Sequence, residues 1–157
     1  MSTLVHTPVG PVWVATDDAG AVTVVQFGTP SVTAAPSEAS DAAASQLREY
    51  FAGDRTEFDL VLAASGTSFQ HRVWAALCEI PYGRTWSYGE LAAQIGQPTA
   101  SRAVGLANGR NPIAIVVPCH RVIGASGTLT GYAGGIERKR WLLDHERAVQ
   151  PTLLADR

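Results

Sequence analysis

The sequence predicts an α+β protein in which a small N-terminal α/β lobe with an antiparallel β-sheet precedes a mainly helical C-terminal domain. Apolar, β-branched runs flank the turn signal "DDAG" in "TPVGPVWVATDDAGAVTVVQFG", which is typical of a β-hairpin. From residue 68 onward, apolar residues recur at helical spacing. Two short helical segments there, separated by a brief turn, indicate a helix-turn-helix. We therefore expect one domain over residues 1–67 and a second over 68–157.

The N-terminal lobe is expected to continue beyond the hairpin with a loop, a helix and one further strand. The segment "TPSVTAAPSEAS" (29–40) is rich in Pro, Ser, Thr and Ala and predicts a loop. The next segment, "DAAASQLREYFAG", predicts a helix with Ser40 or Asp41 as its N-cap and Gly53 at its end. The stretch "TEFDLVL" predicts one more strand.

The second domain is expected to contain four helices. "SFQHRVWAALCEI" predicts a helix with Ser68 as N-cap. Its inward-facing residues are expected to be Phe69, Val73, Leu77 and Ile80. "SYGELAAQIG" predicts a short helix capped by Ser87 with Glu90 at the capping-box position, and "SRAVGLANGRN" predicts the next. In the final helix, "IERKRWLLDHE", the expected inner residues are Ile136, Trp141, Leu142 and His145.

Composition and charge narrow the class of protein. A chain of 157 residues that is 46% hydrophobic can bury a core without disulfides, and its apolar run "IAIVV" is too short to span a membrane. The two cysteines, Cys78 and Cys119, are interpreted as free thiols in a reducing, cytoplasmic setting. No zinc-ligand spacing is present, so no metal is predicted.

Charge is divided unevenly along the chain. Residues 1–68 hold two Lys/Arg against eight Asp/Glu, whereas residues 69–147 hold nine against five. A positive second domain is compatible with contacts to nucleic-acid phosphates, although many solvated faces are basic.

Cys119 lies in the segment "PCHRVIGASG" beside a residue that could activate it. A thiolate is the reactive form of cysteine, and a free thiol has a pKa of about 8.5. His120 could accept the proton directly or through water, and Glu146 on the last helix could orient the imidazole. The alternative is a buried core thiol, which is the interpretation preferred for Cys78 among its apolar neighbours.

The segment "SRAVGLANGRNP" offers Arg102 followed by small or apolar residues. Small side chains let a helix press into a narrow groove, while the arginine could reach into the base stack. Close packing between helices explains the small residues equally well.

Four segments resemble the O6-alkylguanine-DNA alkyltransferases: "PYGRTWSYGELA", "SRAVGLANGRNPIAIVVPCHRVIGASG", "GYAGG" and "WLLDHE". The resemblance is close over 68–147 and loose over the first lobe, for which it implies a ribonuclease H-like fold. It implies repair by irreversible transfer of an alkyl group to the protein's own cysteine, without a cofactor.

The resemblance also implies residue roles. Cys119 corresponds to the alkyl acceptor, His120 to its water-linked base and Glu146 to the partner of that base. Asn111 corresponds to the asparagine that braces the turn before the active site. Tyr88 corresponds to the tyrosine that crowds the target phosphate and protonates the departing guanine.

Two further sets of residues follow from the resemblance. The expected DNA-binding residues are Tyr88, Ser101, Arg102, Ala103 and Gly105, with Arg102 filling the gap left by the rotated nucleotide. The expected pocket residues are Val122, Tyr132, Ala133 and Gly134. Ala133 stands where serine is common in the family, which predicts a change in substrate tolerance.

The implied partner is double-stranded DNA containing O6-alkylguanine or O4-alkylthymine, bound through the minor groove by a monomer that could cluster on DNA through the 29–40 loop. No membrane association is expected. Three alternatives stay open: a protein that recognises the lesion without transfer, a cysteine hydrolase that uses Cys119 and His120, and a helix-turn-helix regulator.

Overall fold

The computed structural model describes the backbone of residues 1–155 and the side chains of residues 1–149. It has the α+β architecture expected from the sequence, divided into two compact units. The first consists of Met1–Ser65 and Pro112–Val116, and the second of Gly66–Asn111 and the chain from Val117 onward. The predicted boundary near residue 67 missed that residues 112–116 belong to the first unit. Residues 156–157 of the second predicted domain lie outside the described part.

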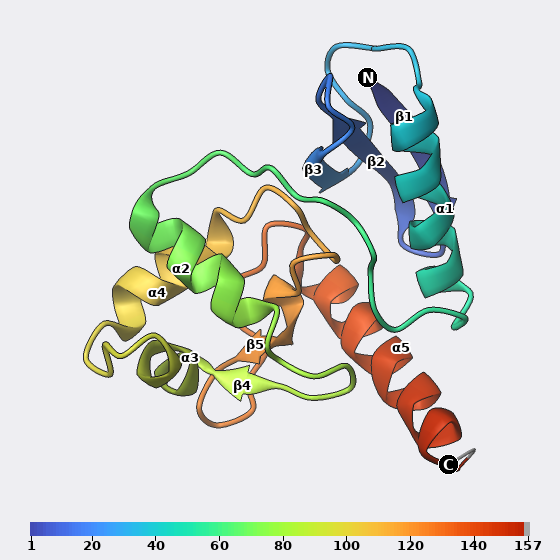
Figure 1. Ribbon diagram of the computed structural model, residues 1–157. Helices are drawn as coiled ribbons and strands as arrows, with labels where there is room; N and C mark the ends of the chain where they lie inside the picture. The colour runs from blue at the N-terminus through green and yellow to red at the C-terminus, as the bar shows by residue number, and fades with distance from the viewer. Residues whose placement is uncertain (156–157) are drawn as a thin grey trace. The chain divides into compact units, whose positions relative to one another are not determined.

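The first unit is a three-stranded antiparallel sheet covered by one helix (Figure 1). The strands β1 (Ser2–Thr7), β2 (Gly10–Thr16) and β3 (Val22–Phe27) pair in that order, and α1 (Glu38–Phe51) lies against β1 and β2. The hairpin predicted around "DDAG" is β2–β3. Alternate strand residues point into the core, and the fully buried ones are Val5, Val12, Val14 and Val25.

Helix α1 begins earlier than predicted, because its N-cap is Ser37 and not Ser40 or Asp41. The Ser37 hydroxyl accepts from the Ser40 N–H at 3.0 Å, and the Ser37 N–H donates to the Ser40 hydroxyl at 2.8 Å. This is a capping box with serine at the position usually held by Glu or Gln, so the sequence pattern does not reveal it.

The stretch "TEFDLVL" is not a strand. It meets the sheet at one residue, where Leu62 bridges Val22 in parallel, and the chain near Ile113 bridges Val25 in the same way. Between those bridges and the second unit, Ile115 adopts a φ of 71°, and the N–H of Val116 donates to the carbonyl of Ala114 at 2.7 Å. A β-branched residue with positive φ at the centre of a γ-turn is strained.

The second unit is mainly helical (Figure 1). Its elements are α2 (Ser68–Leu77), β4 (Trp86–Ser87), α3 (Tyr88–Gln94), α4 (Ser101–Gly109), the 3-10 turn η1 (Cys119–Arg121), β5 (Val122–Ile123) and α5 (Ile136–Ala155). Helix α2 starts after Thr67, which replaces the predicted Ser68 as N-cap. The side chains of Val73, Leu77 and Ile80 are buried as expected, whereas Phe69 is half-buried. No helix in the described part is long and apolar enough to cross a membrane.

Helices α3 and α4 form the predicted helix-turn-helix and pack against α2. The capping box of Ser87 and Glu90 at the start of α3 is confirmed. The indole N–H of buried Trp74 donates to the carbonyl of Ala107 at 2.9 Å, which joins α2 to the end of α4. Strands β4 and β5 pair in parallel and bring Tyr88 beside the chain that follows Ile123.

Two predicted burials in the second unit are wrong. Cys78 ends α2 and is exposed, so it is not a core thiol. Leu142 of α5 is buried as predicted, but Ile136 is 37% exposed. Trp141 and His145 are only half-buried, and their rings stack on each other. Among the side chains of α5 that the structure describes, up to residue 149, the buried ones are Lys139, Leu142, Leu143 and Glu146. Their spacing is helical, but two of them are charged, so hydrophobicity alone places this face wrongly.

We predict that Ser37→Ala lowers the free energy of unfolding by about 1 kcal/mol, because it removes the N-cap of α1. Ser45→Ala is the matched control, since Ser45 is exposed within the same helix and alanine there favours helix formation. Urea denaturation of the full chain measures both variants. Equal effects of the two substitutions would show that Ser37 is not the cap.

Candidate active site

Cys119 is positioned by two consecutive tight turns. Pro118 has φ −81° and ψ 63°, and the N–H of Cys119 donates to the carbonyl of Val117 at 2.8 Å, which is an inverse γ-turn. Proline suits the centre of that turn because its ring fixes φ near this value. The N–H of Arg121 then donates to the carbonyl of Pro118 at 3.0 Å and starts η1. The Cys119 residue is 6% exposed, so its sulfur is enclosed by protein.

Two asparagines tie these turns to the end of α4. Nδ2 of Asn111 donates to the carbonyl of Val117 at 2.8 Å, the same carbonyl that closes the γ-turn. Nδ2 of Asn108 makes a longer bond of 3.4 Å to the carbonyl of Cys119. The bracing geometry expected for Asn111 is therefore present. Asn108 was not identified from the sequence, where only its place near the end of the helix could have drawn attention to it.

Burial raises the pKa of the Cys119 thiol above its ordinary value. A hydrogen bond from the Asn111 side chain, the positive charge of Lys139 and a hydrogen bond from Tyr132 lower that pKa and offset part of the effect of burial. The sulfur is therefore a protonated thiol at rest. It needs a base at the moment of reaction, because only the thiolate is strongly nucleophilic.

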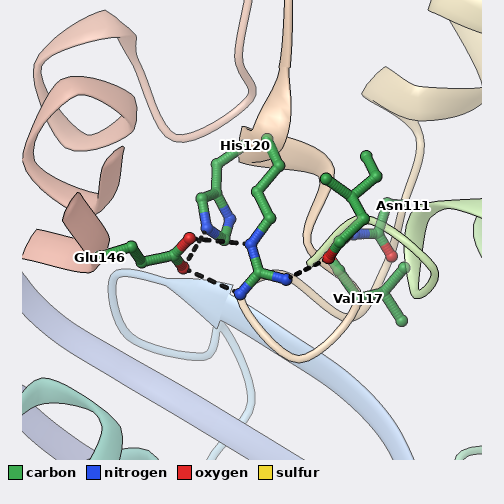
Figure 2. A network of polar contacts seen from close by, with 6 residues as sticks. Asn111, Val117, His120 and Glu146 are labelled. Atoms are coloured by element: carbon green, nitrogen blue, oxygen red, sulfur yellow. Dashed lines mark hydrogen bonds and ion pairs between the residues drawn. The ribbon is translucent and has the colours of Figure 1, made fainter. Parts of the chain in front are cut away.

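The residue after the thiol belongs to a buried charged network. His120 and Glu146 are both almost fully buried, and Nε2 of His120 lies 2.7 Å from Oε2 of Glu146. Figure 2 shows the ring and the carboxylate turned toward each other. Glu146 also accepts from Arg121, with Nε 2.8 Å from Oε1 and Nη2 3.1 Å from Oε2. A third nitrogen of Arg121, Nη1, donates to the carbonyl of Ile80 at 2.8 Å.

Arg121 was not assigned a role from the sequence. Its two parallel bonds to Glu146 supply the charge and the geometry that a buried carboxylate requires. Burial alone would raise the pKa of Glu146, but the hydrogen bonds from His120 and Arg121 and the positive charge of Arg121 hold this pKa well below its usual range. Glu146 is therefore a fixed negative charge at neutral pH.

The fixed carboxylate determines which nitrogen of His120 carries the proton. A carboxylate only accepts hydrogen bonds, so Nε2 donates and a neutral ring keeps its lone pair on Nδ1. Nδ1 is buried and has no hydrogen-bond partner among the described residues. Buried polar groups are normally satisfied, and a water molecule is a common partner where protein atoms are not.

Lys139 is a third residue that the sequence did not indicate, after Asn108 and Arg121. It lies on the inner face of α5, is fully buried, and donates from Nζ to the carbonyl of Thr130 at 3.0 Å. Burial lowers the pKa of Lys139, whereas the negative charge of a Cys119 thiolate raises it. A thiolate at Cys119 and an ammonium at Lys139 therefore stabilise each other.

The predicted pocket residues lie around the loop between β5 and α5. Val122 is buried in β5, whereas Ala133 is exposed and Gly134 is half-buried. The hydroxyl of Tyr132 is buried, and burial, together with interaction with the Cys119 thiol, raises the pKa of Tyr132. This loop therefore reaches the sulfur through Tyr132. No group of three or more His, Cys, Asp or Glu side chains within residues 1–149 could hold a metal ion.

The predicted DNA-binding residues gather at the helix-turn-helix. Tyr88 begins α3, is half-buried, and its hydroxyl lies 3.0 Å from Oγ1 of Thr130. Gly105 lies beside the Tyr88 ring, where an added Cβ would be 3.5 Å from the ring. Arg102 and Ala103 are exposed at the start of α4, and Ser101 is half-buried. No contact joins Arg102 to the buried network in the described structure.

Comparisons with known proteins identify both units. The family model for the 6-O-methylguanine DNA methyltransferase DNA-binding domain matches residues 68–148, and the model for the ribonuclease-like domain of the same proteins matches residues 1–64. A methylated-DNA–protein-cysteine methyltransferase from Mycobacterium bovis is 68% identical over 109 residues, which are 69% of this chain and 66% of the relative. One from Methanosarcina acetivorans is 52% identical, covering 90% of this chain and 94% of the relative.

A solved structure is similar along almost the whole chain. The crystal structure of Mycobacterium tuberculosis OGT in complex with DNA shares 52% sequence identity and a TM-score of 0.86. The match covers 94% of this chain and 93% of that one.

We predict that Glu146→Gln is destabilised by about 3–5 kcal/mol at neutral pH, because it leaves the buried guanidinium of Arg121 without a counter-charge. The pKa of Glu146 is lower in the folded chain than in the unfolded one, where it is about 4.3. Its contribution to stability is therefore complete above that value and lost as the pH falls further. The free energy of unfolding should then fall less steeply below pH ~4.3 in Glu146→Gln than in the wild type.

Urea denaturation over a pH series measures this difference, and Glu137→Gln, at an exposed site in the first turn of the same helix, is the control. Parallel pH profiles for Glu146→Gln and the wild type would rule out a charged Glu146 in the folded state.

Proposed function

The chain belongs to the 6-O-methylguanine DNA methyltransferase family, and we propose that it repairs O6-alkylguanine in DNA by moving the alkyl group irreversibly onto Sγ of Cys119. Its activity is that of a methylated-DNA–protein-cysteine methyltransferase, a DNA repair protein. The observation that carries the assignment to Cys119 is its position. The enclosed thiol adjoins a histidine whose Nδ1 is free to accept a proton and whose Nε2 is held by a buried carboxylate.

The proposed step begins with the thiol proton. A water molecule at Nδ1 of His120 passes that proton from Sγ to the ring, and Glu146 stabilises the imidazolium that forms. The positive charge of Lys139 favours the thiolate in the same interval. Sγ then attacks the alkyl carbon, the bond from that carbon to O6 breaks, and the departing guanine takes a proton from the hydroxyl of Tyr88.

The chemical stability of the product explains why each protein molecule acts only once. The new S–C bond is a thioether, which water does not cleave under these conditions. Each molecule therefore accepts one alkyl group. Tyr132 interacts with the acceptor thiol and, together with Val122, Ala133 and Gly134, forms the proposed wall of the guanine pocket. We propose O4-alkylthymine as a second substrate of this pocket.

The alkyl group on O6 of guanine lies within the stacked bases of DNA. The nucleotide must therefore first rotate out of the duplex, at a cost of about a few kcal/mol. The start of α4 suits this task, because it exposes Arg102 beside Ala103 on a helix with small side chains. We propose that α4 enters the minor groove and that Arg102 occupies the vacated space. Ser101, Gly105 and Tyr88 line the same side and would contact the backbone of the target nucleotide.

The remaining proposals concern the setting of the reaction. The two cysteines are free thiols, which suits a protein that works in the reducing cytoplasm. We propose that it acts as a monomer in solution and that the 29–40 loop contributes to clustering on DNA. We also propose that Ala133, which is exposed, alters the range of alkyl groups accepted.

The first prediction of this proposal concerns the acceptor. With a duplex whose O6-methylguanine carries a labelled methyl group, the wild type should take up at most one label per molecule. Cys119→Ser should take up none and still bind DNA, because a hydroxyl is a much weaker nucleophile. Cys78→Ser, which changes the exposed thiol, should match the wild type. Label remaining on DNA with the wild type would favour lesion recognition without transfer.

The second prediction concerns nucleotide rotation. Arg102→Ala should slow transfer from duplex DNA much more than transfer from free O6-benzylguanine, because only the duplex requires a base to leave the stack. Arg110→Ala removes the same charge from the other end of α4 and controls for general attraction to phosphates. Equal losses with both substrates would refute the role proposed for Arg102.

A further inference from the structure

Thr130 holds two groups that lie on different helices. Its hydroxyl is 3.0 Å from the hydroxyl of Tyr88, the first residue of α3. Its carbonyl accepts from Nζ of Lys139, on the buried face of α5, at 3.0 Å. Thr130 itself lies in the loop between β5 and α5 and is half-buried. The hydrogen bond from the buried ammonium of Lys139 holds the backbone at Thr130, and this restricts the position of the Thr130 hydroxyl.

The direction of the hydrogen bond between the two hydroxyls matters for the reaction. If the Thr130 hydroxyl donates to the oxygen of Tyr88, the proton of Tyr88 is left available for the guanine. Once that proton has moved, the Tyr88 oxygen is a phenolate, and the same donor stabilises the new negative charge. A hydrogen-bond donor that is already oriented toward the atom on which charge develops in the transition state is a major source of rate enhancement in enzymes.

We propose that Thr130 is a positioning residue for alkyl transfer, whose hydroxyl, anchored through Lys139, orients Tyr88 and stabilises its oxygen as the proton leaves for guanine. This inference rests on the proposed function. The balance of protons is complete: the thiol proton moves to His120, the Tyr88 proton moves to the departing guanine, and solvent later returns the proton from the imidazolium to the phenolate. Thr130 neither gains nor loses a proton.

The test is Thr130→Val, which has the shape of threonine without the hydroxyl and keeps the carbonyl that accepts from Lys139. Under single-turnover conditions with an O6-methylguanine duplex, transfer should slow by about tenfold or more, the usual effect of losing a hydrogen bond to developing charge. Thr130→Ser restores the hydroxyl and should recover most of the rate. Thr128→Val, at an exposed position of the same loop, should leave the rate unchanged.

A double-variant cycle with Tyr88→Phe separates positioning from a structural effect. If Thr130 acts through Tyr88, adding Thr130→Val to Tyr88→Phe should slow transfer no further, because the oxygen that the hydroxyl serves is already absent. If the losses multiply, or if Thr130→Val alone is as fast as the wild type, the inference is overturned. Urea denaturation and affinity for undamaged duplex are measured for each variant, so that rates are compared only between variants that fold and bind DNA.

Failure of the inference is distinguishable from failure of the proposed function. Absence of methyl transfer by the wild type would contradict the function itself. Normal transfer by the wild type together with an unimpaired Thr130→Val would contradict only the role of Thr130. If Thr130→Val unfolds, Thr130→Ala in the same cycle gives the rate comparison, since it also lacks the hydroxyl and keeps the carbonyl.

Discussion

The structure of the active site depends on one buried carboxylate. An isolated charge in a protein interior is costly, so Glu146 can be buried only because Arg121 and His120 satisfy both of its oxygens. The same contacts attach α5 to η1, since Arg121 and His120 belong to that turn. They also leave His120 with its lone pair on the buried nitrogen Nδ1. Stability and chemistry thus rest on the same set of hydrogen bonds.

An enclosed thiol with a raised pKa suits a protein that reacts once. A permanently ionised, accessible thiolate would react with oxidants and other electrophiles before it met damaged DNA. Here burial keeps the sulfur protonated, while Asn111, Lys139 and Tyr132 favour the thiolate. We therefore propose that the thiolate forms only when a substrate is bound. The chain combines this buried thiol with a helix-turn-helix. Thr130 joins Tyr88 of that motif to the loop that carries Tyr132.

The sequence predicted the features that depend on neighbours in the chain. The cap of α3 was visible because Ser87 and Glu90 stand three residues apart, and the segment around Cys119 carried the family resemblance. Features that depend on distant partners were missed. Lys139 was missed because its partner, Thr130, comes from elsewhere in the chain. Glu146 was expected as the partner of His120, but its two bonds from Arg121 were not foreseen. The cap at Ser37 was missed because serine takes the place of the usual acid.

The tautomer of His120 tests the central claim most directly. Nitrogen-15 NMR of histidine-labelled protein, with the His120 signals assigned by comparison with His120→Gln, reports which ring nitrogen carries hydrogen at the pH used for transfer. The account predicts a neutral ring protonated at Nε2 and unprotonated at Nδ1. A proton on Nδ1 in the unreacted protein would contradict it, because that nitrogen could not then accept the thiol proton.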